Sequence, residues 1–80
     1  MERGQIVCSK AGSDKETFLA VIEVKDKEVY VSDGKRYKIE NPKKKNQKHL
    51  AKTDRLLNDA ELSTDKQLRK ALAKYRSSIK

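Results

Sequence analysis

The sequence is poor in the residues from which many catalytic and metal sites are built. It contains no tryptophan, one cysteine (Cys8) and one histidine (His49) among its 80 residues. A single cysteine cannot form a disulfide framework, and Cys8 with His49 cannot supply the four ligands of a structural zinc ion. We therefore expect Cys8 to be a small buried residue of a strand in a reduced protein.

Long apolar stretches and catalytic motifs are missing as well. No run of about 18 apolar residues is long enough for a membrane span, and no charged-then-apolar leader for export opens the chain. The sequence has no glycine-rich phosphate loop, no Gly-x-Ser-x-Gly and no His-Glu-x-x-His. We therefore expect a soluble, cytoplasmic, monomeric protein that is not an enzyme, needs no metal or cofactor and does not bind membranes.

Charge, in contrast, is abundant and unevenly distributed. Lysine and arginine number 20 against 12 acidic residues, which gives a net charge of +8. Residues 1–40 contain eight basic and eight acidic residues, whereas residues 41–80 contain twelve basic and four acidic ones. The whole excess therefore lies in the second half. This distribution is typical of a small folded core followed by a part that binds a polyanion.

The first half alternates apolar and polar residues with the period of two that strands require. Asp33-Gly34 predicts a type I′ hairpin turn between the third and fourth strands, and Asn41-Pro42 ends the fourth. A short fifth strand over 47–51 would close the sheet. The prediction is a mainly β fold, a small antiparallel barrel, with its first four strands at 6–8, 18–24, 29–32 and 36–40.

The second half changes its pattern after Thr53. Apolar residues then recur at steps of three and four, which predicts an amphipathic helix over 65–78, and Thr64 with Gln67 forms a capping-box signature at its start. Residues 54–63 are expected to be a weakly structured tether. The chain is thus divided into a barrel (1–53, with a basic segment at 43–55) and a tether with a helix (54–80). Because an isolated helix of this length is marginal in water, it docks on the barrel, meets a partner or frays.

The basic segment is the main candidate for a binding site. Residues 43–55 carry six basic residues and one acid, Asp54. A phosphate backbone rewards such clustering because each contact releases condensed counterions; a solvated loop is the alternative. Tyr37 lies between Arg36 and Lys38, and on a strand it could stack on an unpaired base or pack in the core. Tyr30 has no such basic neighbours.

At this point the residues resemble a known family. Gly4–Lys15 followed by Phe18–Ile22 is similar to the KOW motif of ribosomal proteins and transcription elongation factors. Lys43-Lys44-Lys45, His49-Leu50 and Thr53-Asp54, followed by a charged helix, resemble small bacterial KOW-domain RNA-binding proteins and the large-subunit ribosomal protein family called "fourteen-e". The resemblance covers most of residues 3–55 and loosely the helix. It implies an SH3-like barrel that binds structured RNA, above all ribosomal RNA, without catalysis.

The expected function is therefore RNA binding at the large ribosomal subunit. The alternative is a KOW-type protein-interaction module of the transcription or translation machinery with little RNA affinity, whose partner would contact the helix face Leu68, Leu72, Tyr75 and Ile79. The resemblance places loop contacts near Gly12, and Glu16, which stands where many such loops have a glycine, is not among them. The expected RNA-binding residues are Lys10, Gly12, Ser13, Lys15, Lys35, Arg36, Tyr37, Lys43, Lys44, Lys45, Lys48, His49, Lys52 and Arg55.

Overall fold

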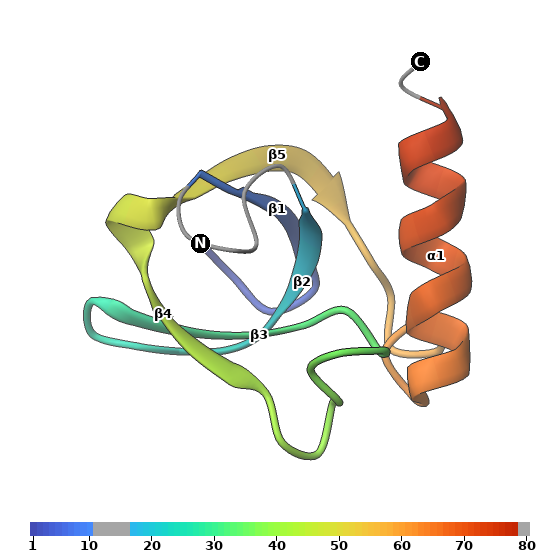
Figure 1. Ribbon diagram of the computed structural model, residues 1–80, viewed down its shortest axis with the longest axis horizontal. Coiled ribbons are helices and arrows are strands. Elements are labelled where there is room, and N and C mark those ends of the chain that lie inside the picture. Colours follow the sequence, from blue (N-terminus) through green and yellow to red (C-terminus); the bar gives the residue numbers. More distant parts are fainter. Residues whose placement is uncertain (11–16, 79–80) are drawn as a thin grey trace.

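The structure is a computed structural model that describes residues 1–10 and 17–78. Within these residues, five antiparallel strands form one sheet, and an α-helix follows them (Figure 1). The mainly β fold and the C-terminal helix are thus confirmed. The elements are β1 (Gln5–Ser9), β2 (Phe18–Lys25), β3 (Glu28–Ser32), β4 (Lys43–Asn46), the 3-10 helix η2 (Gln47–His49), β5 (Leu50–Leu56) and α1 (Asp65–Ser78).

The sheet is strongly bent. Its strand order is β4-β3-β2-β1-β5, so that β4 and β5 stand at opposite ends of the order, yet only the three residues of η2 join them. The two ends of the sheet must therefore approach each other at η2, as Figure 1 shows. Register shifts between Val21 and Glu23 and between Gln5 and Val7 contribute to the bend, because a bulge bends a strand and increases its twist.

Each side of the sheet carries its own apolar cluster, because successive strand residues point to opposite faces. The cluster inside the bend includes residues from β3 and β5, which are not neighbours in the sheet. It consists of Val7, Leu19, Val21, Val29, Val31 and Leu50. The cluster on the other face lies under α1 and consists of Ile6, Ala20, Leu57, Leu62, Leu68, Ala71 and Leu72. The expected burial of both faces of the second strand is therefore confirmed.

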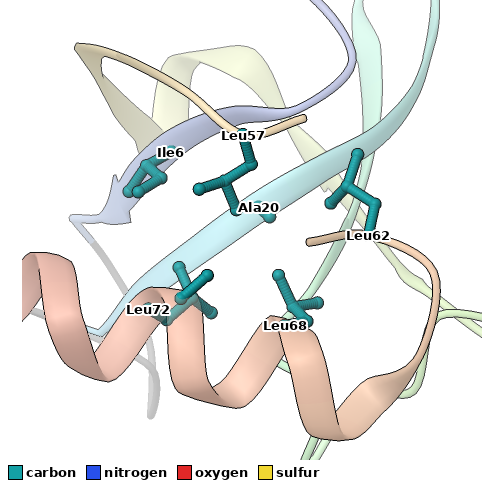
Figure 2. Packing of buried hydrophobic residues seen from close by; sticks show 7 residues of the cluster. Ile6, Ala20, Leu57, Leu62, Leu68 and Leu72 are labelled. Carbon is teal, nitrogen blue, oxygen red and sulfur yellow. The ribbon is translucent and has the colours of Figure 1, made fainter. Parts of the chain in front are cut away.

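Helix α1 docks on the face of β1 and β2. Leu68 and Leu72 point from the helix toward the sheet, and Leu68 is completely buried (Figure 2). The Tyr75 ring meets Phe18 of β2 edge to face, with 5.3 Å between the ring centroids. The proposed partner-binding face is thus covered by the protein's own sheet at Leu68 and Leu72, while Ile79 lies outside the described residues. Docking is the alternative that the structure adopts.

The start of α1 agrees with the sequence prediction. Thr64 Oγ1 accepts a hydrogen bond from the Gln67 amide at 3.1 Å, which caps the helix. Helix α1 is too short and too polar to cross a bilayer, and no other helix among the described residues could do so.

The predicted fourth strand is wrong. Residues 33–42 form a loop, and β4 begins only at Lys43, directly after Pro42. The cause is Asp33, whose Oδ1 accepts the backbone amides of Lys35, Arg36 and Tyr37 at 2.8–2.9 Å. An aspartate that binds the backbone ahead of it favours a turn over a strand.

The predicted hairpin turn is wrong for a related reason. Gly34 has a positive φ of 74°, but Asp33 does not, so a type I′ turn is excluded. The tight turn of the sheet lies instead between β2 and β3, where Asp26 has a φ of 51°. The fifth strand is also displaced, since residues 47–49 form η2 and the strand begins at Leu50. The Asn46 side chain accepts the Lys48 amide at 2.9 Å and so favours the 3-10 turn.

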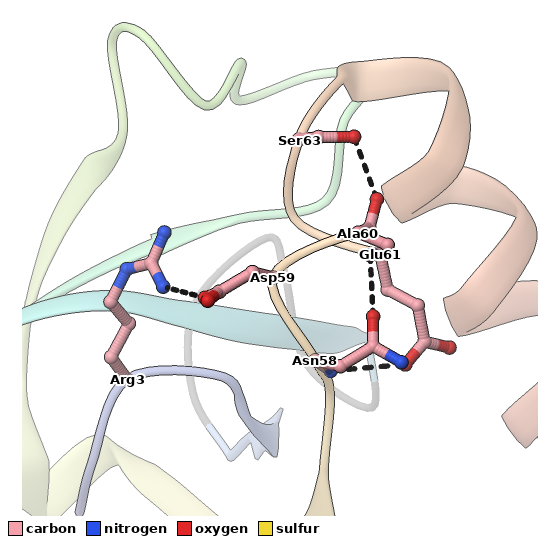
Figure 3. A network of polar contacts seen from close by, with 6 residues as sticks. All are labelled: Arg3, Asn58, Asp59, Ala60, Glu61 and Ser63. Atoms are coloured by element: carbon pink, nitrogen blue, oxygen red, sulfur yellow. Dashed lines mark hydrogen bonds and ion pairs between the residues drawn. The ribbon is translucent and has the colours of Figure 1, made fainter.

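Residues 54–63 are not a weakly structured tether. Strand β5 continues to Leu56, so that the boundary expected after residue 53 falls within it. Leu57 and Leu62 are 7% and 3% exposed and complete the cluster under α1. The segment also makes reciprocal hydrogen bonds between Asn58 and Glu61, and Figure 3 shows them beside the 2.8 Å ion pair of Arg3 and Asp59. The physical reason is the two buried leucines, which hold the segment between sheet and helix.

Candidate nucleic-acid interface

Strand β4 is an edge strand made almost entirely of lysine. Its residues are Lys43, Lys44, Lys45 and Asn46, and its partner in the sheet is β3. Lys43 and Lys44 are exposed, and Lys45 is half-buried. The basic run Lys43-Lys44-Lys45 therefore belongs to a strand and not to a loop.

The pairing register sends these lysines to two faces. Lys44 stands opposite Tyr30, and its ammonium lies 3.3 Å from the Glu28 carboxylate. Lys25 covers the Tyr30 ring at 5.7 Å from the centroid and lies 3.9 Å from Glu23. The face around Tyr30 thus balances its charges, two lysines against two glutamates, which weakens it as a site for polyanions.

Lys43 and Lys45 lie on the face of β4 that points away from Lys44, and they pair with Val31 and Val29 of β3. The Lys43 ammonium is 5.9 Å from the centroid of the Tyr37 ring, which packs against the cluster inside the bend. Tyr37 therefore has a packing role, the alternative to base stacking that its sequence position left open.

The fold brings further basic residues to η2, where β4 turns into β5. The Lys10 amide donates to the His49 carbonyl at 2.9 Å, and the Gln47 amide donates to the Lys27 carbonyl at 3.3 Å. Lys10, Lys27, Lys48 and His49 are all exposed. We call the seven residues gathered here and on β4 the basic edge: Lys10, Lys27, Lys43, Lys44, Lys45, Lys48 and His49.

Lys27 is a member of the basic edge that the sequence analysis missed. It lies in the stretch Lys25-Asp26-Lys27-Glu28, whose charges cancel, and nothing in that stretch indicates a site. Hydrogen bonds from Gln47 to the carbonyls of Asp26 and Lys27, together with the pairing of Glu28 and Asn46, bring the β2–β3 turn beside η2. A neighbour across the sheet of this kind leaves no mark in a local sequence pattern.

Other expected site residues lie elsewhere. Lys52 is exposed on β5, opposite Val7. Arg55 lies at the α1 side of the molecule, 4.0 Å from Glu61, so segment 43–55 does not form one surface. Lys35 and the exposed Arg36 belong to the loop 33–42, and Lys35 borders a groove along α1. Gly12, Ser13 and Lys15 lie outside the described residues.

The remaining candidate for chemistry is Cys8. It lies on β1 between Phe18 and Ala51 and is half-buried, with its thiol 3.7 Å from the Ser9 carbonyl oxygen. Across residues 1–10 and 17–78, no group of three or more His, Cys, Asp or Glu side chains could hold a metal ion. The charged surface is thus the feature from which function can be argued.

Comparison of the chain with models of known protein families and with curated proteins found no match. The inference of function therefore depends on the arrangement of the residues. Exposed lysines from four separate segments on one edge are suited to a partner that carries regularly spaced negative charges, since each ammonium acts as a mobile point charge.

Proposed function

We propose that this protein is a non-catalytic RNA-binding protein of the KOW type, which contacts ribosomal RNA of the large subunit through its basic edge. The observation that carries the proposal is the convergence of lysines at the basic edge. Lys10 follows β1, Lys27 lies in the β2–β3 turn, and Lys48 lies in η2, and all three join the lysines of β4. Residues that are distant in sequence meet in one place where positive charge is in excess, although Lys44 is paired with Glu28; such an excess is what a phosphate backbone attracts.

The bent sheet supports the finer part of the proposal, an SH3-like barrel. Five short strands lie in a sheet whose two edge strands are joined by three residues. Such a sheet is bent nearly into a barrel, and small barrels of this kind present side chains from several turns on one surface. The proposal of a KOW-type module combines this shape with the motif at residues 4–22.

The lack of apolar surface favours RNA over a protein partner. Among the residues that the structure describes, Leu56 is the one large hydrophobic residue that is exposed, at 50%. The centres of protein interfaces are enriched in apolar and aromatic residues, and an exposed apolar patch normally marks them. Because Leu68 and Leu72 are buried between α1 and the sheet, the surface of the described residues is mainly charged.

The test is a salt titration of RNA binding with matched variants. The first variant replaces Lys43, Lys44 and Lys48 with Gln, which removes three charges and leaves polar side chains on the edge strand. The control replaces three exposed lysines of α1, Lys66, Lys70 and Lys74, with Gln. Lys45 is left unchanged because it is half-buried.

For the edge variant we expect weaker binding to all RNA sequences and a flatter dependence of log affinity on log salt, by roughly 0.7–0.9 for each phosphate that the variant no longer neutralises. The control should retain the slope of the wild type. A wild-type slope in the edge variant would show that the basic edge is merely solvated.

A second experiment addresses the ribosome. The native protein should sediment with large subunits at low salt and dissociate at high salt, because its contacts are electrostatic. Association with RNA polymerase in the absence of ribosome association would instead favour the protein-interaction module.

A further inference from the structure

A groove of about 330 Å³ lies between α1 and the start of the loop that follows β3. Three cationic side chains border it: Lys35 from the loop, and Arg69 and Arg76 from the helix. Phe18, Leu72 and Ala73 supply apolar surface to the same groove. Its size is near the lower limit of ligand pockets, which suits one nucleotide-sized group.

The structure holds one of these cations in place. The Arg69 guanidinium donates to the Gly34 carbonyl at 2.8 Å, which fixes its direction along the groove wall. Asp33 also borders the groove, but its Oδ1 already accepts three backbone amides. Among the residues that the structure describes, three cations against one carboxylate give the lining a formal charge of +2.

A second groove on the other side of α1 provides a comparison. It is larger, about 430 Å³, and is bordered by Arg55 and Lys74 together with Asp54. Arg55 also pairs with Glu61 at 4.0 Å. Two acids therefore offset two cations there, so that the smaller groove is the one that favours an anion.

We propose that the groove between Lys35 and Arg76 binds one nucleotide of an RNA strand, with a phosphate at the cations and the base on the apolar surface of Phe18 and Ala73. This inference rests on the proposed function and gives it a second contact. The cationic lining suits a phosphate, and a base has a flat apolar face that aromatic and apolar side chains accept without sequence preference.

The two contacts lie on different sides of the molecule. Helix α1 and the turn from β4 to β5 stand at opposite ends of the view in Figure 1, and the longest dimension of the protein is 28 Å. One short oligonucleotide therefore fills the groove or the basic edge, whereas a folded RNA engages both. The basic edge meets the backbone of a duplex, and the groove takes an unpaired nucleotide.

The test uses the full chain with Lys35 and Arg76 both replaced by Gln. Arg69 is kept because it anchors the loop. The matched control replaces Lys66 and Lys70 with Gln; both are exposed on α1 and border neither groove. A second pair compares Ala73→Glu, which adds an acid to the lining of the groove, with Ser77→Glu, an exposed site outside both grooves.

Binding is measured by salt titration with a mixed-sequence single-stranded RNA and with a blunt RNA duplex. We expect the single-strand salt slope of the groove variant to flatten by roughly 0.7 for each phosphate that is no longer neutralised. Ala73→Glu should weaken single-strand binding, and both groove variants should bind the duplex like the wild type. The Lys66/Lys70 and Ser77→Glu controls should bind both RNAs like the wild type.

If both groove variants bind the single strand like the wild type, the inference is overturned. The proposed function would stand in that case, provided that the basic-edge variant still shows a flatter salt slope. The reverse result, weaker binding in the groove variants alone, would support the groove and contradict the role of the basic edge. Displacement of the RNA by poly-glutamate as effectively as by competitor RNA would assign the groove to acidic peptides and also overturn the inference.

Discussion

Docking of α1 on the sheet predicts a large effect of Leu68→Ala. Leu68 is completely buried in the cluster with Ile6, Leu57 and Leu62 (Figure 2). Replacing a buried leucine with alanine lowers the free energy of unfolding by about 2–5 kcal/mol, since less apolar surface is buried and a cavity remains. Alanine is the best helix former, so the destabilisation reports packing and not helix propensity.

This magnitude is large relative to the whole protein. At about 0.05–0.15 kcal/mol per residue, a chain of this length is stabilised by roughly 4–12 kcal/mol. Each 1 kcal/mol shifts Tm by about 4–8 °C in a domain of this size. We therefore expect Leu68→Ala to lower Tm by roughly 8–40 °C, measured by far-ultraviolet circular dichroism and checked by urea denaturation.

The matched control is Lys70→Ala, an exposed position two residues along the same helix. Its free energy of unfolding should change by no more than about 0.5 kcal/mol. Equal Tm values for Leu68→Ala and Lys70→Ala would refute the reasoning. That result would mean that α1 does not pack on the sheet in solution, and that residues 54–80 behave as the separate tether and helix that composition predicts.

Two further predictions concern the loop that follows β3. Gly34→Ala should destabilise the protein by about 1 kcal/mol or more, because Gly34 has a φ of 74° and a Cβ there would clash with the Asp65 carbonyl oxygen. Asparagine tolerates this φ but also has a Cβ, so Gly34→Asn should be no more stable than Gly34→Ala. A higher Tm for Gly34→Asn than for Gly34→Ala would contradict the clash. Asp33→Ala should lower the free energy of unfolding by about 1–3 kcal/mol, because three backbone amides lose their acceptor. Asp33→Asn should be destabilised less, since its side-chain oxygen can still accept. Equal destabilisation of the two variants in urea denaturation would count against this role of Asp33.

The sequence predicts those elements whose pattern is local. The alternation in β1, β2 and β3 and the three- and four-residue spacing of Leu68, Ala71 and Leu72 each lie within one segment, and the structure confirms them. Burial of both faces of β2 could also be predicted, since apolar residues occupy successive positions there.

The errors arise where a polar contact overrides the local pattern. Residues 36–40 alternate like a strand, but the Asp33 carboxylate binds the next amides and turns the chain. The Ile39 amide then donates to Asp65 at 2.9 Å, a contact across 26 residues. Neither interaction has a periodicity that a sequence pattern could reveal.

The boundary expected after residue 53 falls within β5 for a similar reason. Leu57 and Leu62 stand in a polar stretch without helical or strand spacing, and their burial depends on a surface formed by β1, β2 and α1. The Gly4 carbonyl accepts the Leu57 amide at 2.8 Å, and this hydrogen bond joins the start of the predicted barrel to the segment expected to be a tether. Composition alone cannot indicate such a contact, because it concerns partners that are distant in sequence.

Lysines on an edge strand have two physical explanations, and the basic edge allows them to be separated. Charge at an edge prevents strands of other molecules from pairing with it, which would account for Lys43, Lys44 and Lys45 without any ligand. It does not account for Lys10, Lys27 and Lys48, which lie outside β4 and protect no unpaired strand. Edge protection therefore leaves the positions of these three lysines beside β4 unexplained, whereas the proposed binding of phosphates accounts for them.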